Sequence, residues 1–126
     1  MSNDIEVPRN FKLLDELDNV KKYNNISYGL TSNDDNLMHS WNGTIFHNNG
    51  DISTLEIYVG DDYPTKPPTV KLLEYNDESN QGCRLARLFN KNRELSSTFN
   101  IIKNWSPAFS IGDILQALLL HSTTKR

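Results

Sequence analysis

The sequence predicts an α+β domain in which a helix near each end packs on one face of a four-stranded antiparallel meander. Apolar residues recur at helical spacing over residues 8–22 and 111–121. Four short strand-like runs lie between these two stretches. Asn49-Gly50, between the second and third runs, is a strong hairpin signal. At 126 residues, the chain (1–126) is expected to form a single domain with its own core.

The first helix is expected over roughly residues 8–22. Pro8 suits a first helical position, and Asn24-Asn25 ends the pattern. The predicted apolar stripe consists of Phe11, Leu14, Leu17 and Val20, with Leu13 widening it. The acidic residues between them are expected to face water: Asp15, Glu16 and Asp18.

The four strands are expected near residues 26–30, 37–46, 52–59 and 69–75. In the third, alternation places Leu55, Ile57 and Val59 on one face and Ile52, Thr54, Glu56 and Tyr58 on the other. Because Ile52 and Tyr58 are apolar, the second face is expected to contact something outside the core. Between the third and fourth strands lies a stiff segment with three prolines, Tyr63-Pro64-Thr65-Lys66-Pro67-Pro68.

Residues 76–98 are polar and break the alternation, with a helical turn expected at 84–89. Their basic cluster is interpreted as part of a solvated loop, because no alternating aromatics or glycine-rich cradle accompany it: Arg84, Arg87, Lys91 and Arg93. The last helix, over roughly 111–121, begins with a capping box formed by Ser110 and Asp113. Its apolar stripe is Ile111, Ile114, Leu115, Leu118 and Leu119.

Composition excludes several function classes. The net charge of −3 gives no field that favours nucleic acid or an anionic membrane, and no apolar run approaches the roughly 20 residues of a membrane span. A single cysteine and three dispersed histidines (His39, His47, His121) predict neither a disulfide framework nor a metal site. We expect no cofactor, and a soluble intracellular protein.

Two motifs occur in an order that indicates a particular fold. Tyr63-Pro64-Thr65-Lys66-Pro67-Pro68 follows the third strand, and Asn104-Trp105-Ser106-Pro107-Ala108 precedes the capped helix. This arrangement resembles the ubiquitin-conjugating enzyme fold. The N-terminal half, with Val7-Pro8-Arg9-Asn10-Phe11, Ser27-Tyr28-Gly29-Leu30 and Trp41-Asn42-Gly43-Thr44-Ile45, resembles the ubiquitin-conjugating enzyme variants, the noncatalytic relatives. The resemblance covers roughly residues 7–75 and 98–121. Active enzymes usually carry two more helices beyond the last one here, which the variants lack.

The resemblance also locates the catalytic position. In active conjugating enzymes, the cysteine lies eight residues before the tryptophan of the Trp-Ser-Pro motif, which corresponds here to Ser97. A serine hydroxyl without a base is a poor acceptor for a thioester-linked group. At the expected His-Pro-Asn position stands Glu78-Ser79-Asn80, of which only Asn80 matches. Two alternatives stay open: a divergent active enzyme that uses Cys83, and an RWD-type interaction module.

The resemblance implies a protein that works by positioning. A variant of this family pairs with an active conjugating enzyme and holds acceptor ubiquitin for synthesis of signalling, non-proteasomal polyubiquitin chains in DNA-damage tolerance, in cytoplasm and nucleus. The matching residues for enzyme docking are Val7, Asn10 and Phe11, with Phe11 as anchor and simple core packing as its alternative role. Those for acceptor ubiquitin are Ser27, Thr44 and Ile52. Two departures from the family are a shorter hairpin at 47–51 and a longer loop at 82–97.

Overall fold

The computed structural model describes residues 8–32 and 37–123. Near the N-terminus, helix α1 spans Arg9–Asn19 and continues into a 3-10 turn, η1, at Val20–Lys22. The predicted helix over 8–22 is therefore confirmed, with Pro8 just before its first residue. Pro8 lacks a backbone N–H, so it leaves no unpaired donor at this position, and its carbonyl accepts the Lys12 N–H at 3.1 Å.

The sheet contains four antiparallel strands in chain order: β1 (Ile26–Leu30), β2 (Ser40–Phe46), β3 (Ile52–Tyr58) and β4 (Thr69–Glu74). The predicted second strand begins later than expected, at Ser40 and not at residue 37. Met38 has a positive φ of 54°, and its carbonyl accepts the Trp41 indole N–H at 2.8 Å, which holds the chain in a turn. The hairpin signal is confirmed, since Gly50 takes the φ of +93° that glycine tolerates best.

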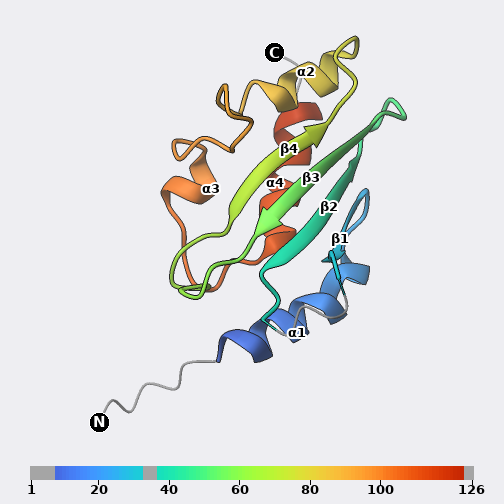
Figure 1. Cartoon of the computed structure of the whole chain (residues 1–126). Coiled ribbons are helices and arrows are strands. Elements are labelled where there is room, and N and C mark those ends of the chain that lie inside the picture. Colours follow the sequence, from blue (N-terminus) through green and yellow to red (C-terminus); the bar gives the residue numbers. More distant parts are fainter. Residues whose placement is uncertain (1–7, 33–36, 124–126) are drawn as a thin grey trace.

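Helix α4 (Ile111–Thr123) crosses one face of the sheet, and none of the helices among the described residues covers the opposite face (Figure 1). The core lies between α4 and the covered face, where the predicted Leu55, Ile57 and Val59 are buried. The predicted capping box forms, with Ser110 N–H donating to Asp113 at 3.0 Å and Asp113 N–H donating to Ser110 Oγ at 3.1 Å. The predicted α4 stripe is also buried: Ile111, Ile114, Leu115, Leu118 and Leu119.

Residues 76–98 are more ordered than their composition indicates. Helix α2 spans Asn80–Ala86, so the predicted turn at 84–89 is wrong in its start and its end. The Ser79 side chain caps α2 by accepting the Gly82 N–H at 3.2 Å. An isolated bridge between Lys71 and Glu94 fastens the following loop along β4, and a second bridge, between Phe89 and Leu95, lies within that loop. A further short helix, α3 (Asn100–Lys103), has no counterpart in the prediction.

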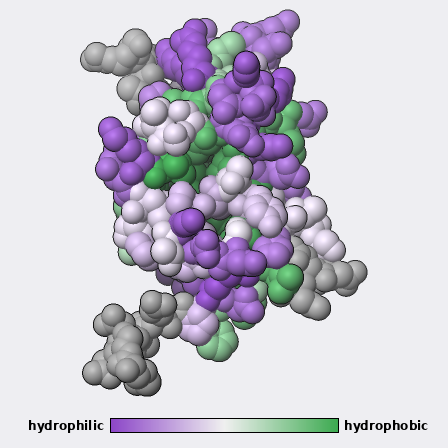
Figure 2. Space-filling view, turned by 60° about the vertical axis from the view of Figure 1, so that its left-hand side comes forward, coloured by the Kyte–Doolittle hydropathy of each residue, from purple (hydrophilic) through white to green (hydrophobic). Residues whose placement is uncertain are grey.

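The two motifs that carried the family resemblance meet in space. The Trp105 indole N–H donates to the Pro64 carbonyl at 2.7 Å, and its ring lies 6.1 Å from that of Tyr63. This bond joins the proline segment to the approach to α4, although the two are 41 residues apart. Figure 2 shows the side of the molecule on which α3 lies, where hydrophilic residues predominate with apolar ones visible between them. No helix among the described residues has the length and apolarity that a membrane span needs.

Candidate functional site

The N-terminal part of α1 presents an apolar surface to solvent. Phe11 is 65% exposed and Leu14, one turn further on, is 51% exposed. Asn10 is exposed beside them, while Val7 lies outside the described residues. The alternative role of Phe11 in core packing is therefore wrong. The predicted apolar stripe also does not face the core at Phe11 and Leu14. An exposed aromatic on a helix surface is the form that an interface anchor takes before its partner binds.

Arg9 fixes the direction in which this surface points. Its guanidinium donates to the carbonyls of Leu37 (2.6 Å), Gly60 (2.9 Å), Val59 (3.0 Å) and Met38 (3.4 Å). These acceptors belong to the segments before β2 and after β3, so one side chain connects the start of α1 to one end of the sheet. The planar fork of arginine suits several acceptors at once, whereas a lysine ammonium on a flexible stem does not.

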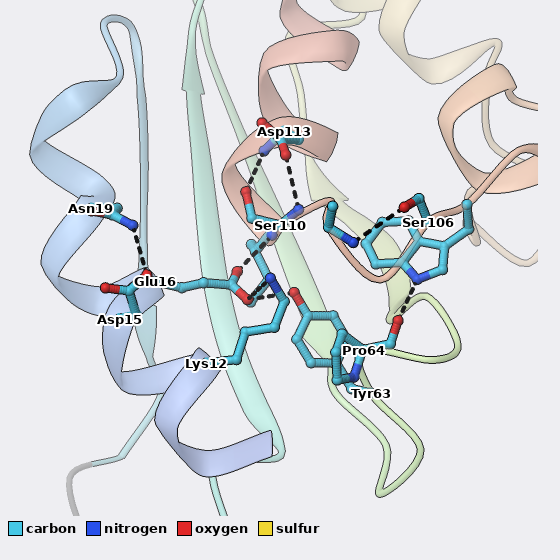
Figure 3. A network of polar contacts seen from close by, with 12 residues as sticks. Lys12, Asp15, Glu16, Asn19, Tyr63, Pro64, Ser106, Ser110 and Asp113 are labelled. Carbon is cyan, nitrogen blue, oxygen red and sulfur yellow. Dashed lines mark hydrogen bonds and ion pairs between the residues drawn. The ribbon is translucent and has the colours of Figure 1, made fainter. Parts of the chain in front are cut away.

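Glu16 holds the rest of α1 in place. Its carboxylate accepts the Tyr63 hydroxyl at 2.5 Å and the Ile111 backbone N–H at 2.7 Å, with Lys12 Nζ 3.8 Å away (Figure 3). Its own carbonyl accepts the Tyr28 hydroxyl at 2.9 Å. The expectation that Glu16 faces water is wrong, since only 2% of it is exposed. Glu16 is buried because tertiary contacts require it: its carboxylate accepts hydrogen bonds from a buried hydroxyl and from the otherwise unpaired first N–H of α4.

Burial dominates the ionisation of this network. Loss of hydration raises the pKa of Glu16, although the hydrogen bonds from Tyr63 and Ile111 and the charge of Lys12 act in the opposite direction. Burial, followed by the nearby Glu16 charge, also raises the pKa of Tyr63. The Tyr63 hydroxyl therefore stays protonated, and the hydrogen bond that it donates to Glu16 joins the proline segment to α1.

The uncovered face of the sheet brings the other predicted residues together. Ser27 on β1 stands directly opposite Thr44 on β2, which in turn stands opposite Thr54 on β3. One pair further along, Ile52 stands opposite Phe46. The prediction that Ile52 and Tyr58 point away from the core is confirmed, since they are 52% and 51% exposed. Ser27, Thr44 and Ile52 thus form one continuous surface, at the hairpin end of the sheet.

Ser97, which the family resemblance predicts at the position of the catalytic cysteine, is exposed and lies in a turn before α3. It borders a groove of about 250 Å³ lined by the proline segment, the start of β4 and Ile102. Among the described residues, no hydrogen bond joins Ser97 to a histidine or a carboxylate. The same part of the chain contains no cluster of three or more histidine, cysteine, aspartate or glutamate side chains suited to a metal ion.

The histidines are engaged elsewhere. His47 is buried, with Nε2 2.7 Å from Ser53 Oγ and Nδ1 3.4 Å from Ser122 Oγ. His39 pairs with Asp61 at 2.9 Å. The His121 ring packs edge-on against Phe99.

Cys83 lies within α2, half-buried, where its Sγ donates to the Asp77 carbonyl at 3.1 Å. Asn80 is the first residue of the same helix and is therefore part of a helix start. Cys83 thus sits in a helix that packs beside α4, away from the groove that Ser97 borders. This placement does not provide the shallow, accessible setting that a thioester-forming cysteine needs.

Known proteins were compared with this sequence and structure. The ubiquitin-conjugating enzyme E2 variant 1C of Arabidopsis thaliana is 36% identical over 124 residues, which cover 90% of this chain and 80% of the relative. The ubiquitin-conjugating enzyme variant MMS2 of Saccharomyces cerevisiae is 34% identical over 127 residues, which cover 94% and 88%. This chain belongs to the ubiquitin-conjugating enzyme E2 variant family. The prediction of this family is confirmed, and the RWD-type alternative is set aside.

The fold comparison agrees. Human ubiquitin-conjugating enzyme E2 G1 superposes with a TM-score of 0.71 at 19% identity, covering 95% of this chain and 99% of that one. This confirms the ubiquitin-conjugating enzyme fold. No family model matches the sequence. As an E2 variant, the chain is a noncatalytic member of the ubiquitin-conjugation system, whose partners in general are a conjugating enzyme and ubiquitin.

Proposed function

We propose that the chain forms a heterodimer with an active ubiquitin-conjugating enzyme through the start of α1, and that the uncovered sheet face holds acceptor ubiquitin. Residues Val7, Asn10 and Phe11 form the enzyme-docking surface, and Ser27, Thr44 and Ile52 bind the acceptor. The product is a signalling, non-proteasomal polyubiquitin chain used in DNA-damage tolerance, made in the cytoplasm and nucleus.

The exposure of Phe11 is the observation that carries the proposal. A phenylalanine ring that is 65% exposed leaves apolar area in water, and burying it in a partner pocket releases that cost. Leu14 extends the apolar surface along the same helix. Arg9 and Glu16 hold α1 against the sheet and α4, so little ordering is required when a partner binds.

The proposed contribution to catalysis is orientation. The lysine of an acceptor bound on the sheet face is presented to a thioester carried by the partner, so that a bimolecular attack becomes effectively unimolecular. The chain supplies no nucleophile to this reaction. A side chain that contacts the acceptor therefore affects the concentration of acceptor that the reaction requires, whereas one that contacts the enzyme affects assembly of the complex.

The test is a thioester and chain-formation assay with a panel of active conjugating enzymes, with and without this protein. We expect no ubiquitin thioester on this protein and stimulation of free-chain synthesis by at least one enzyme of the panel. Phe11→Ala should weaken the affinity for that enzyme by about 30- to 900-fold, which corresponds to a hot-spot loss of about 2–4 kcal/mol.

Leu120→Ala is the matched control, because Leu120 is an equally apolar residue that is 58% exposed on α4. It should leave affinity and chain synthesis unchanged. A reducible ubiquitin adduct on this protein that is lost on Cys83→Ala would contradict the proposal. Lack of stimulation by every enzyme of the panel would also contradict it.

A further inference from the structure

The hairpin end of the uncovered sheet face carries an exposed apolar pair. Phe46 on β2 and Ile52 on β3 are directly opposite one another and are 41% and 52% exposed. Cross-strand pairs of an aromatic and a β-branched residue pack side by side. In the part of the chain that the structure describes, no helix lies over this face (Figure 1). The pair therefore offers a contiguous apolar contact to a partner.

The neighbouring rows of this face are polar. The row next to the pair is Ser27, Thr44 and Thr54, and the row beyond it is Gly29, Asn42, Glu56 and Lys71. Phe46 lies two residues from Thr44 along β2, so both side chains leave the same side of the strand. Phe46 thus belongs to the same surface as the three residues proposed to bind the acceptor.

The backbone beneath the pair is fixed. The Asn49 side chain donates to Asp51 at 2.8 Å and to Ser79 at 2.9 Å, and the Asn76 side chain donates to Asp51 at 3.0 Å. These bonds hold the turn toward the loop between β4 and α2. On the inner side, buried His47 bonds Ser53. The short hairpin is therefore tied down and leaves the pair uncovered, which favours binding because little ordering is needed.

The pair is also remote from the proposed docking surface. Arg9 joins α1 to the other end of β2 and β3, at the carbonyls of Met38 and Val59. Ser40–Phe46, the length of β2, spans about 20 Å at the rise of an extended strand. An enzyme bound at Phe11 and a ligand bound at Phe46 can thus occupy the molecule at the same time.

We propose that Phe46 is a further acceptor-positioning residue, whose ring joins Ile52 to receive an apolar patch of acceptor ubiquitin. This inference rests on the proposed function, since it continues the Ser27, Thr44 and Ile52 surface. The apolar pair supplies affinity, and the adjacent hydroxyls of Ser27 and Thr44 fix the orientation. Acceptor proteins that lack an apolar patch at the matching position should bind more weakly, which makes Phe46 a specificity-determining residue.

The experiment titrates isotopically labelled ubiquitin with the wild-type protein and with Phe46→Ala, Phe46→Leu, Ile52→Ala and Tyr58→Ala. Tyr58 is the matched control, because it is an aromatic residue of similar exposure on the same face at the opposite end of β3. We expect about a tenfold weaker affinity for Phe46→Ala and for Ile52→Ala, about wild-type affinity for Tyr58→Ala, and an intermediate value for Phe46→Leu.

In chain synthesis with the partner enzyme, Phe46→Ala should raise the KM for acceptor ubiquitin about tenfold, with kcat and enzyme affinity unchanged. Normal acceptor affinity in Phe46→Ala, together with a loss in Ile52→Ala, would overturn this inference and leave the proposed function intact. Absence of ubiquitin binding by the wild-type protein would refute the acceptor half of the proposed function. Self-association that is abolished by Phe46→Ala would assign the pair to a second copy of this chain and overturn the inference.

Discussion

Replacing Glu16 by alanine tests whether the buried carboxylate joins three parts of the fold. The variant leaves the Tyr63 hydroxyl and the Ile111 N–H, which Glu16 accepts at 2.5 and 2.7 Å, without their acceptor. Each buried unsatisfied group costs about 1–3 kcal/mol, so the expected loss in the free energy of unfolding is about 2–6 kcal/mol. This is a large part of the roughly 5–15 kcal/mol typical of a domain. With the average unfolding entropy per residue, it lowers Tm by about 8–23 °C.

Glu16→Gln separates the hydrogen bonds from the charge. Its amide keeps an acceptor for Ile111 and offers Tyr63 a donor, so the expected loss is about 1 kcal/mol. Asp18→Ala, an exposed change on the same helix, should alter the free energy of unfolding by less than about 0.5 kcal/mol. Thermal and urea denaturation of all three variants measure these differences.

The dependence of stability on pH provides a second signature. Because burial raises the Glu16 pKa above its ordinary value of 4.5, the folded protein holds this proton more tightly than the unfolded chain. The contribution of the protonated Glu16 to the free energy of unfolding is complete below pH 4.5. It is lost as the pH rises through the raised pKa, and the free energy of unfolding then falls by at most about 1.4 kcal/mol per pH unit. Glu16→Gln should lack this contribution. A glutamine variant as unstable as the alanine variant, with the wild-type pH slope, would refute the reasoning.

Two further predictions concern Arg9 and His47. Arg9→Ala should lower the free energy of unfolding by about 2–3 kcal/mol through lost charge-assisted hydrogen bonds, and should weaken enzyme docking. Arg9→Lys should recover little of either, and exposed Lys21→Ala should change neither, in denaturation and affinity measurements. Burial lowers the pKa of His47, so the unfolded chain binds its proton more readily. Stability should fall as the pH drops below about 6.5, and this fall should be shallower in His47→Asn; an unchanged slope would argue against it.

The strand pattern and the α4 cap were readable from sequence because each depends on local spacing. Alternation placed Leu55, Ile57 and Val59 in the core, and the Ser110–Asp113 box needs only residues three apart. The prediction missed the bounds of α2 and the whole of α3, because each helix is too short to show helical periodicity. A bridge between the loop and β4, and another within the loop, provide order that composition cannot reveal.

The rotation of α1 could not be predicted from sequence. A stripe through Phe11, Leu14 and Leu17 and a face through Leu13, Glu16 and Leu17 both have helical spacing, and the first contains more apolar residues. The second faces the core because Glu16 finds partners 47 and 95 residues away. Charged residues are rarely fully buried, so exposure to solvent was the better expectation for the Glu16 side chain.

Signals exist in the sequence for two of the three functional residues that the prediction missed. A cation in the first turn opposes the helix dipole, so Arg9 directly after Pro8 indicated a tertiary role. Phe46 follows buried Ile45, so the period of two already placed an aromatic side chain on the outer face. Only Glu16 offers no such signal. The predicted binding roles of Val7, Asn10, Phe11, Ser27, Thr44 and Ile52 stay predictions.

Arg9 also donates to its neighbour Asn10 on α1, but every acceptor that joins it to the sheet is a main-chain carbonyl, and this has an evolutionary consequence. A carbonyl is present whichever side chain its residue carries, so positions 37 and 60 can exchange side chains without releasing the helix, whereas Met38 and Val59 also belong to the core. At Gly60, for example, an added methyl group would meet no atom within 4 Å. Descendants of this protein could thus change the surface beside the start of α1 while the helix keeps the same attachment to the sheet.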